Sequence, residues 1–267
     1  MGIRNHYKNG VFNWVDLMTT EPDAAKTFYS KLFGWTFLDQ PTDMGAVYSM
    51  ALKNTGDAQR SVAALFAMPE EIKQQSIPPH WQSYINVLDL DASIQRWQQN
   101  GGSIINAPRD VMTSGRMAMV QDPTGAIVSL WQAKDHIGAE LVNEVNTFCW
   151  AELQTRGSDT AGDFYKAVFD WEIEVDDKPP YYLIGKVSGK QNCGIFDMDR
   201  IGLPASIPVQ WAVYFNVENL DTAIDIVKAN GGKVMMDPMV IDPGRFTTIT
   251  DPQGAVLAIM EVNDPDD

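Results

Sequence analysis

The stretch "FNWVDLMTTEPDAAKTFYSKLFGW" at residues 12–35 decides the fold, because residues 148–171 repeat it as "FCWAELQTRGSDTAGDFYKAVFDW". Both copies carry a tryptophan, a carboxylate two residues later, a Phe-Tyr pair and a closing tryptophan at the same spacing. Self-similarity over such a distance is typical of a duplicated structural unit. We therefore predict that the chain is built from two copies of one domain.

Two further pairs of segments extend the repeat. Residues 76–102 match residues 206–232, and residues 114–131 match residues 243–260. The offset between the halves falls from 136 to 129 residues along the chain, as expected when loops gain or lose residues after a tandem duplication.

The length of 267 residues fits two domains of ordinary size. We place them at residues 8–134 and 144–263. The segment "AKDHIGAELVNE" at residues 133–144 is predicted to be an exposed polar linker.

Each half divides again into two similar units. Residues 12–20 have an apolar strand pattern, and the helix predicted after them has Pro22 in its first turn, where proline is favoured. Apolar residues follow at the spacing of one buried helix face: Ala25, Phe28, Tyr29 and Leu32. Residues 46–54 and 61–69 are then predicted to be strands.

The same order of elements restarts near residue 82. Residues 82–88 are predicted to be a strand, and the next helix to begin with Asp91 as its N-cap and to stop at Gly101-Gly102. Two more strands, at 115–122 and 126–132, flank an Asp-Pro-Thr-Gly turn. We therefore predict an α+β chain of four βαβββ modules.

Composition limits the partners and the compartment. The net charge of −15 repels phosphate backbones and anionic membrane surfaces, so we expect no nucleic-acid or membrane partner. No apolar run reaches the roughly 18–20 residues of a membrane span, and the first residues lack the pattern of a secretory signal. Cys149 and Cys193 form no disulfide or metal motif. We expect a soluble cytoplasmic protein.

Three motifs occur once in each half: Trp-x-Asp/Glu, Trp-x-x-Tyr-x-Asn-Val, and Gly-Arg-x₅-Asp-Pro-x-Gly-Ala. With the modular pattern, they give a sequence that resembles the vicinal oxygen chelate superfamily of glyoxalases, bleomycin-resistance proteins and extradiol dioxygenases, and especially its tandem glyoxalase-like branch. The resemblance covers nearly the whole chain. It implies that two modules form a curved sheet around a ligand cavity, with helices outside.

The resemblance also implies where enzymes of the superfamily hold a divalent metal, usually with histidine and glutamate. By spacing, the corresponding positions here are Trp14, Gln82, Ser129, Trp150, Ala212 and Ala258. Tryptophan and alanine offer no metal ligand, and such sites require imidazole and carboxylate groups. The histidines fall elsewhere, at His6, His80 and His136. We therefore expect no metal and no other cofactor.

Strand alternation predicts the side chains that line the cavities. Val15 and Leu17 suit the helix-covered face, so Trp14, Asp16 and Met18 face the cavity. The same rule selects Gln82, Tyr84 and Asn86 in the second module, and Trp150, Glu152, Gln154, Ala212, Tyr214 and Asn216 in the second half. We predict that each pocket holds a tryptophan, a carboxylate, a tyrosine and an asparagine.

Structural roles remain open for the same residues. The tryptophans could belong to the core. Asp16 could be tied to Tyr84 or Asn86 for stability alone, since a buried carboxylate needs partners. Arg116 and Arg245, at strand starts, either neutralise the acids or hold an anionic ligand, or they are solvated.

Three functions follow from these residues. The first is metal-free binding of a small molecule, stacked on Trp14 and Trp150, as in the bleomycin-resistance type. The second is a lyase or isomerase that acts next to a carbonyl, with Asp16 or Glu152 as general acid or base and Tyr84 or Tyr214 as proton partner. The third is a metal-dependent glyoxalase-like enzyme with ligands from Asp16, Glu152, Gln82 or Ser129. Four modules can complete two cavities in one chain, so a monomer or a homodimer is expected.

Overall fold

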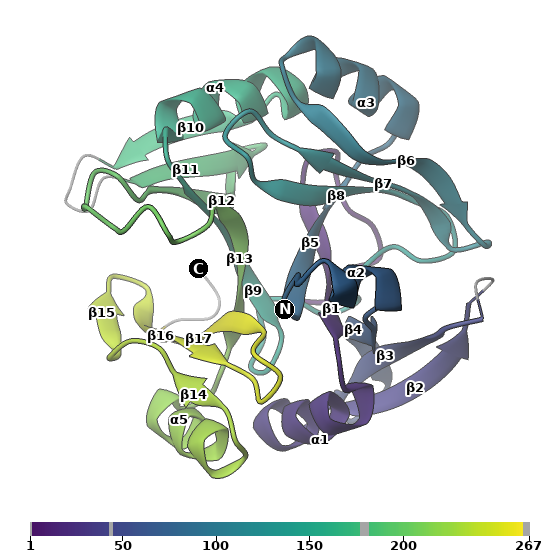
Figure 1. Cartoon of the computed structure of the whole chain (residues 1–267), viewed down its shortest axis with the longest axis vertical. Coiled ribbons are helices and arrows are strands. Elements are labelled where there is room, and N and C mark those ends of the chain that lie inside the picture. Colours follow the sequence, from purple (N-terminus) through teal and green to yellow (C-terminus); the bar gives the residue numbers. More distant parts are fainter. Residues whose placement is uncertain (1, 43–44, 177–181, 264–267) are drawn as a thin grey trace.

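The computed structural model describes residues 2–42, 45–176 and 182–263. Figure 1 shows two similar halves, each a curved sheet with two long helices on one side. The elements of the first half are β1 (Phe12–Thr19), α1 (Pro22–Phe33), β2 (Thr36–Pro41), β3 (Val47–Asn54), β4 (Gln59–Ala67), α2 (Glu70–Gln74), β5 (His80–Asn86), α3 (Leu90–Gln99), β6 (Ser103–Val111), β7 (Gly115–Gln121) and β8 (Ile127–Ala133).

The second half repeats this order. Its elements are β9 (Phe148–Thr155), α4 (Ser158–Phe169), β10 (Glu172–Asp176), β11 (Tyr182–Val187), β12 (Lys190–Asp197), β13 (Gln210–Asn216), α5 (Leu220–Ala229), β14 (Lys233–Val234), β15 (Met239–Ile241), β16 (Gly244–Thr250) and β17 (Val256–Val262). The α+β class and the four βαβββ modules are confirmed.

The two modules of each half form one sheet. In the described residues the first sheet has eight strands in the order β2-β3-β4-β1-β5-β8-β7-β6, and the modules join where β1 and β5 pair antiparallel. The second sheet follows the order β10-β11-β12-β9-β13-β17-β16-β14, with β15 also paired to β16. Its last strand is split into β14 and β15, and Pro238 lies in the interruption, where proline cannot donate to a ladder.

The helix caps differ from the prediction by two residues. The cap of α3 is Asp89, whose side chain accepts a hydrogen bond from the backbone N–H of Ala92 at 3.0 Å, and Asp91 is already inside the helix. In α5 the cap is Asn219, which accepts from Thr222 at 2.8 Å. Predicting Asp91 as the cap was therefore wrong, because Leu90 is helical and buried.

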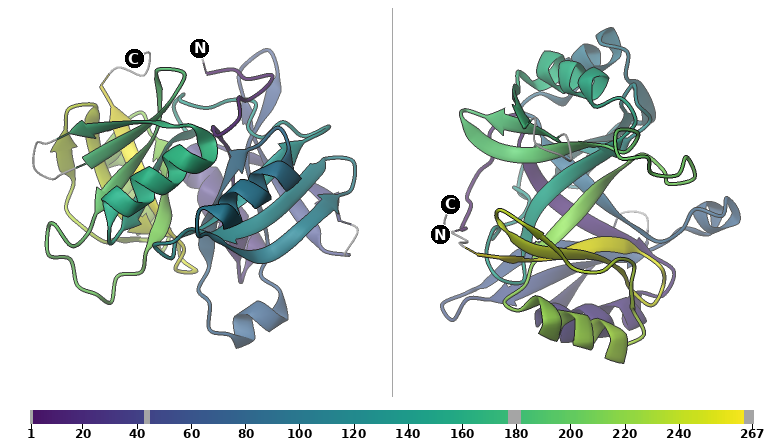
Figure 2. Two further views of the ribbon diagram at one scale, coloured as in Figure 1. Left: turned by 90° about the horizontal axis from the view of Figure 1, so that it is seen from above. Right: turned by 90° about the vertical axis from the view of Figure 1, so that its left-hand side faces the viewer.

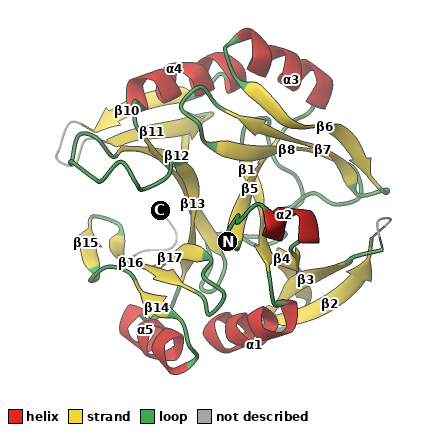
Figure 3. Ribbon diagram, in the orientation of Figure 1, coloured by secondary structure: helices red, strands yellow, loops and turns green. Residues whose placement is uncertain are grey.

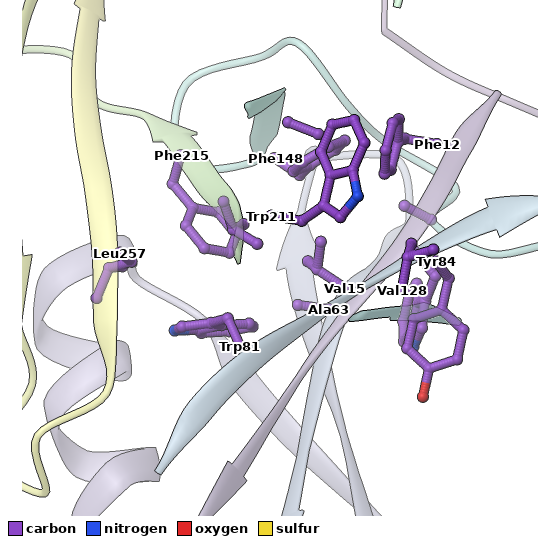
Figure 4. Close-up of a cluster of buried hydrophobic side chains, with 14 of the residues drawn as sticks. Phe12, Val15, Ala63, Trp81, Tyr84, Val128, Phe148, Trp211, Phe215 and Leu257 are labelled. Atoms are coloured by element: carbon purple, nitrogen blue, oxygen red, sulfur yellow. The ribbon is translucent and has the colours of Figure 1, made fainter. Parts of the chain in front are cut away.

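The two halves pack through their helix-bearing faces. α1 lies beside α5 at one end of the seam and α3 beside α4 at the other, as Figures 1 and 2 show. Between these pairs the rings of Trp81 and Phe215 lie 4.9 Å apart, and those of Phe12 and Trp211 lie 4.7 Å apart (Figure 4). One continuous core therefore runs through both halves.

Hydrogen bonds across the seam repeat in each half. Tyr29 donates to Asp251 Oδ2 at 3.0 Å, and Tyr165 donates to Asp122 Oδ2 at 2.9 Å. The closing tryptophan of the first repeat donates to Asn146 O, and Trp171 donates to Gly10 O, both at 2.9 Å. The repeated aromatic residues thus form hydrogen bonds that join the two halves.

The segment between the halves is partly buried, so the prediction of an exposed linker was wrong. Leu141 and Val142 are buried, and Leu141 pairs with Ile3. Gly138 has a φ of 104° and lies so close to the backbone of Asn13 that a side chain there would clash. Linker residues 133–142 therefore follow a defined path along the first half.

Figure 3 shows α1 and α5 at one end of the molecule and α3 and α4 at the other, with the sheets between them. No helix in the described ranges is long and apolar enough to cross a membrane.

Candidate ligand site

The side of the first sheet that faces away from the helices carries a hydrogen-bonded group of four residues. Trp14 Nε1 donates to the hydroxyl of Tyr48 at 2.9 Å. The hydroxyls of Tyr48 and Tyr84 both donate to Asp16 Oδ2 at 2.8 Å. We call these residues, Trp14, Asp16, Tyr48 and Tyr84, the first acid cluster.

The second sheet repeats the arrangement. Trp150 Nε1 donates to the Tyr182 hydroxyl at 3.0 Å, and Tyr182 donates to Glu152 Oε2 at 2.9 Å. Tyr214 donates to Glu152 Oε1 at 2.9 Å, and Gln154 donates to the same oxygen at 3.1 Å. We call Trp150, Glu152, Tyr182 and Tyr214 the second acid cluster.

Strand register explains why these residues meet. Trp14 on β1 is the Cα partner of Tyr84 on β5, and Trp150 on β9 is the partner of Tyr214 on β13. Each acid is two residues further along its strand, so it lies on the same face. In Figure 4 the hydroxyl of Tyr84 points away from Trp81 and Trp211.

Tyr48 and Tyr182 complete the clusters but were absent from the predicted site. They come from β3 and β11, each of which is the second strand from the edge of its sheet. From there their hydroxyls reach Asp16 and Glu152. A signal was available in the sequence. Tyr182 follows Tyr48 by 134 residues, and this spacing falls between the offsets of the repeated segments before and after the two tyrosines.

Burial controls the ionisation of both acids. It raises the pKa of Asp16 to about 7, against the opposing effect of the hydrogen bonds from Tyr84 and Tyr48. Burial likewise raises the pKa of Glu152, with the bonds from Gln154, Tyr182 and Tyr214 acting in the opposite direction. Asp16 can therefore change its charge near neutral pH.

The two clusters differ in exposure. Trp14 and Asp16 are 3% and 2% exposed, whereas Trp150 and Glu152 are only partly buried. The tryptophan and the acid of the first cluster are thus more deeply buried than those of the second, while Tyr48 is partly exposed.

The remaining predicted strand residues divide into two groups. Gln82 is the Cα partner of Asp16, and Ser129 is that of Tyr84, so both lie next to the first cluster. Ala212 and Ala258 occupy the same places beside Glu152 and Tyr214. The predicted cavity face therefore brings these four positions together with the acids.

The two asparagines lie at the ends of their strands and do not join the clusters. Asn86 Nδ2 donates to the backbone oxygens of Tyr7 and Lys8, at 2.9 and 3.1 Å. Asn216 is bonded through its backbone to Asn146 and Thr147. Both positions hold the segment that leads into the first strand of their half.

The two predicted arginines also lie apart from the acids. Arg116 forms a two-point ion pair with Asp91 at 2.8 and 3.1 Å, and Arg245 pairs in the same way with Asp221 at 3.1 and 3.0 Å. Each pair joins a strand start to the first turn of a helix. Neither arginine neutralises Asp16 or Glu152.

The donor set does not fit the metal that the fold implies. The positions that would hold it carry tryptophan, glutamine, serine and alanine in place of histidine and glutamate. In the described ranges no group of three or more histidine, cysteine, aspartate or glutamate residues could bind an ion. Asp16 and Glu152 bond to tyrosines instead.

A surface hollow of about 470 Å³ lies elsewhere, between α3 and α4, lined by residues that include Asn100, Pro123 and Phe164. It is a feature of the seam between the halves. Neither acid cluster contributes to it.

Comparison with known proteins agrees with this architecture. The model of the glyoxalase/bleomycin resistance protein/dioxygenase superfamily matches residues 11–130 and again residues 147–259. A protein of Mycobacterium bovis named "Putative glyoxylase CFP32" is 40% identical over 98% of both chains. The anthracycline biosynthesis protein DnrV of Streptomyces peucetius is 29% identical over 94% of this chain and 93% of its own.

The fold also resembles a solved structure. The Mn(II)-bound glyoxalase from Novosphingobium aromaticivorans superposes with a TM-score of 0.64 at 14% identity, over 95% of this chain and 82% of the other. Similarity at that identity concerns the fold alone. With the family model matched in both halves, the chain belongs to the glyoxalase/bleomycin resistance protein/dioxygenase superfamily.

Proposed function

We propose that this protein binds a small organic molecule on the helix-free faces of its sheets, without a metal ion. The observation that carries the proposal is the duplicated cluster of tryptophan, carboxylate and two tyrosines. It occupies the part of each sheet where the fold implies a metal, and the donors that a metal would need are replaced there.

The chemistry of the clusters supports an organic ligand. Aromatic rings provide large apolar contact surfaces, and a few placed polar groups orient the molecule. In the second cluster Trp150 and Glu152 are partly exposed, so a ligand can reach them. The names of the two relatives, a glyoxylase and an anthracycline biosynthesis protein, both refer to small-molecule chemistry.

A metal-independent lyase or isomerase is the second candidate, and one observation favours it. The pKa of Asp16 is raised to about 7, which is where a general acid or base works best at neutral pH. Tyr84, bonded to Asp16, would be its proton partner. A metal-dependent glyoxalase agrees with the name of the Mycobacterium relative but not with the donor set.

Titration with Nile red, a neutral planar dye whose fluorescence rises in apolar surroundings, tests binding directly. We expect saturable binding to the wild type, weakened about three- to tenfold by Trp14→Phe combined with Trp150→Phe, because stacking surface is lost. Arg116→Gln is the control, since Arg116 is paired with Asp91 away from the clusters. Equal affinity in the double variant and the control would contradict the proposal.

A further inference from the structure

Six buried polar atoms in the described part of the first half have no hydrogen-bond partner, and three of them belong to residues on or beside the face that carries the first acid cluster: Asp16 Oδ1, Ser129 Oγ and His136 Nε2. Buried polar atoms in folded proteins are nearly always paired, because an unpaired group loses its hydration without compensation. Unpaired atoms on or beside one face of a sheet therefore indicate a missing partner.

Tyr84 connects Asp16 and Ser129. Its hydroxyl bonds the other oxygen of Asp16, and Ser129 is its Cα partner on β8. Cα partners on neighbouring strands present their side chains on the same face of the sheet, so the Ser129 side chain lies beside that of Tyr84.

His136 reaches the same place from the linker. Its ring stands edge-on to Trp14 at 4.5 Å and lies 5.8 Å from Trp131, whose ring is 6.5 Å from Tyr84. The backbone oxygen of His136 accepts from Trp131 Nε1 at 2.8 Å, which holds the backbone of this residue next to Trp131. Burial lowers the pKa of His136 to about 4, with Glu140 opposing, so the imidazole is neutral at pH 7.

The second half lacks these features. Both oxygens of Glu152 are already bonded, by Tyr182, Tyr214 and Gln154. Ala258 stands where the first half has Ser129. The duplicated domains have therefore diverged at the atoms that would contact a polar ligand.

On the basis of the proposed function, we propose that the first half holds a specific site for a small neutral aromatic molecule that carries a hydroxyl or amino group. Trp14 and Trp131 form its aromatic walls, while Asp16 Oδ1, Ser129 Oγ and His136 Nε2 bond its polar group. The linker, residues 133–142, covers the site through His136. When ionised, Asp16 disfavours an anionic ligand. The second half has Ala258 in place of Ser129 and both oxygens of Glu152 already bonded, so it should bind the polar group of this ligand more weakly.

Phenol and anisole test this assignment, because they share a ring and differ in the hydroxyl donor. The chain has three histidines, so the imidazole NMR signals of His136 can be assigned with the His136→Phe variant. We expect phenol to shift these signals saturably and anisole to bind at least about fivefold more weakly, the effect of one hydrogen bond.

Variants locate the site. Ser129→Ala copies Ala258 and should weaken phenol at least about fivefold while the protein folds normally, since it removes an unpaired hydroxyl. His136→Phe, which keeps a ring against Trp14, should have the same effect on affinity measured by calorimetry. Arg245→Gln is the control in the second half, since Arg245 is paired with Asp221 away from the clusters, and it should leave phenol affinity unchanged.

Three results would overturn the inference and leave the proposed function standing. They are equal binding of phenol and anisole, unchanged phenol affinity in Ser129→Ala, or unchanged His136 signals while Nile red still binds. The last result would mean that ordered water alone fills the space. Failure of all three probes would contradict both proposals.

Discussion

The hydroxyl of Tyr29 in the first half donates a hydrogen bond to Asp251 of the second half at 3.0 Å. Tyr29 also accepts from Trp81 Nε1 at 3.1 Å, so it is bonded on both sides. Tyr165 repeats the contact in the opposite direction, to Asp122. These paired bonds hold the halves together through their helix-bearing faces, and the two acid clusters consequently lie on faces turned away from the seam.

Removing one of these hydroxyls should destabilise the whole chain. Tyr29→Phe leaves Asp251 Oδ2 and Trp81 Nε1 buried without their partner, so the free energy of unfolding should fall by about 1–3 kcal/mol. Tyr165→Phe should cost a similar amount, and the double variant about the sum. Urea unfolding measures this. Unchanged stability in both single variants would show that the bonds do not hold the halves together.

Stability should depend on pH through Asp16. Its folded pKa, about 7, is above the ordinary value of 3.8, so the folded state holds a proton that the unfolded state has lost between these values. The contribution of Asp16 to the free energy of unfolding is therefore greatest below pH 4 and is lost as the pH rises through 7. At about 1.4 kcal/mol per unit, the loss is on the order of 4 kcal/mol.

The Asp16→Asn variant removes this contribution and isolates it. The difference in unfolding free energy between wild type and Asp16→Asn, measured in urea from pH 4.5 to 8, should move in favour of the variant up to about pH 7 and level off above it. A difference that does not change with pH would show that Asp16 stays ionised throughout.

The arginines that were predicted to serve the acids should prove dispensable. Arg116→Gln and Arg245→Gln break exposed ion pairs with Asp91 and Asp221, which contribute little because water screens them. The unfolding midpoint and the affinity for Nile red should both stay at the wild-type values. A marked loss of affinity in either variant would place that arginine in the site.

Metal content provides an independent check. We expect elemental analysis of protein purified without chelator to find no near-stoichiometric zinc, nickel, manganese or iron, because the positions of the fold's metal ligands carry Trp14, Gln82 and Ser129. A stoichiometric metal that is lost in Asp16→Asn or Glu152→Gln would identify those acids as ligands.

Much of the fold follows from patterns that are local or repeated. The stripe of Ala25, Phe28, Tyr29 and Leu32 predicted α1, and all four residues are buried. Alternation along β1 placed Trp14 and Asp16 on one face, and the structure joins both to the same hydrogen-bonded cluster. Repetition then predicted the second half from the first.

The parts that were missed depend on contacts distant in sequence. Tyr48 reaches Asp16 from two strands away, and strand periodicity does not specify such a pairing. Asn86 satisfies the alternation rule, yet its side-chain amide donates a hydrogen bond to the backbone of Tyr7, before β1. The burial of the linker depends on how residues 133–142 pack against β1 and the first residues, which polar composition did not reveal.

The most direct test of the central claim is the phenol affinity of Asp16→Asn, measured together with its melting temperature. Asparagine keeps the volume, and its amide oxygen can still accept from Tyr48 and Tyr84. Its NH2 group then stands in the place of Oδ1, so a hydrogen-bond donor replaces the free acceptor. If Asp16 serves the ligand, affinity should fall at least about fivefold while the melting temperature does not fall at pH 7. A lower melting temperature with unchanged affinity in the folded fraction would contradict the account, because Asp16 would then be structural.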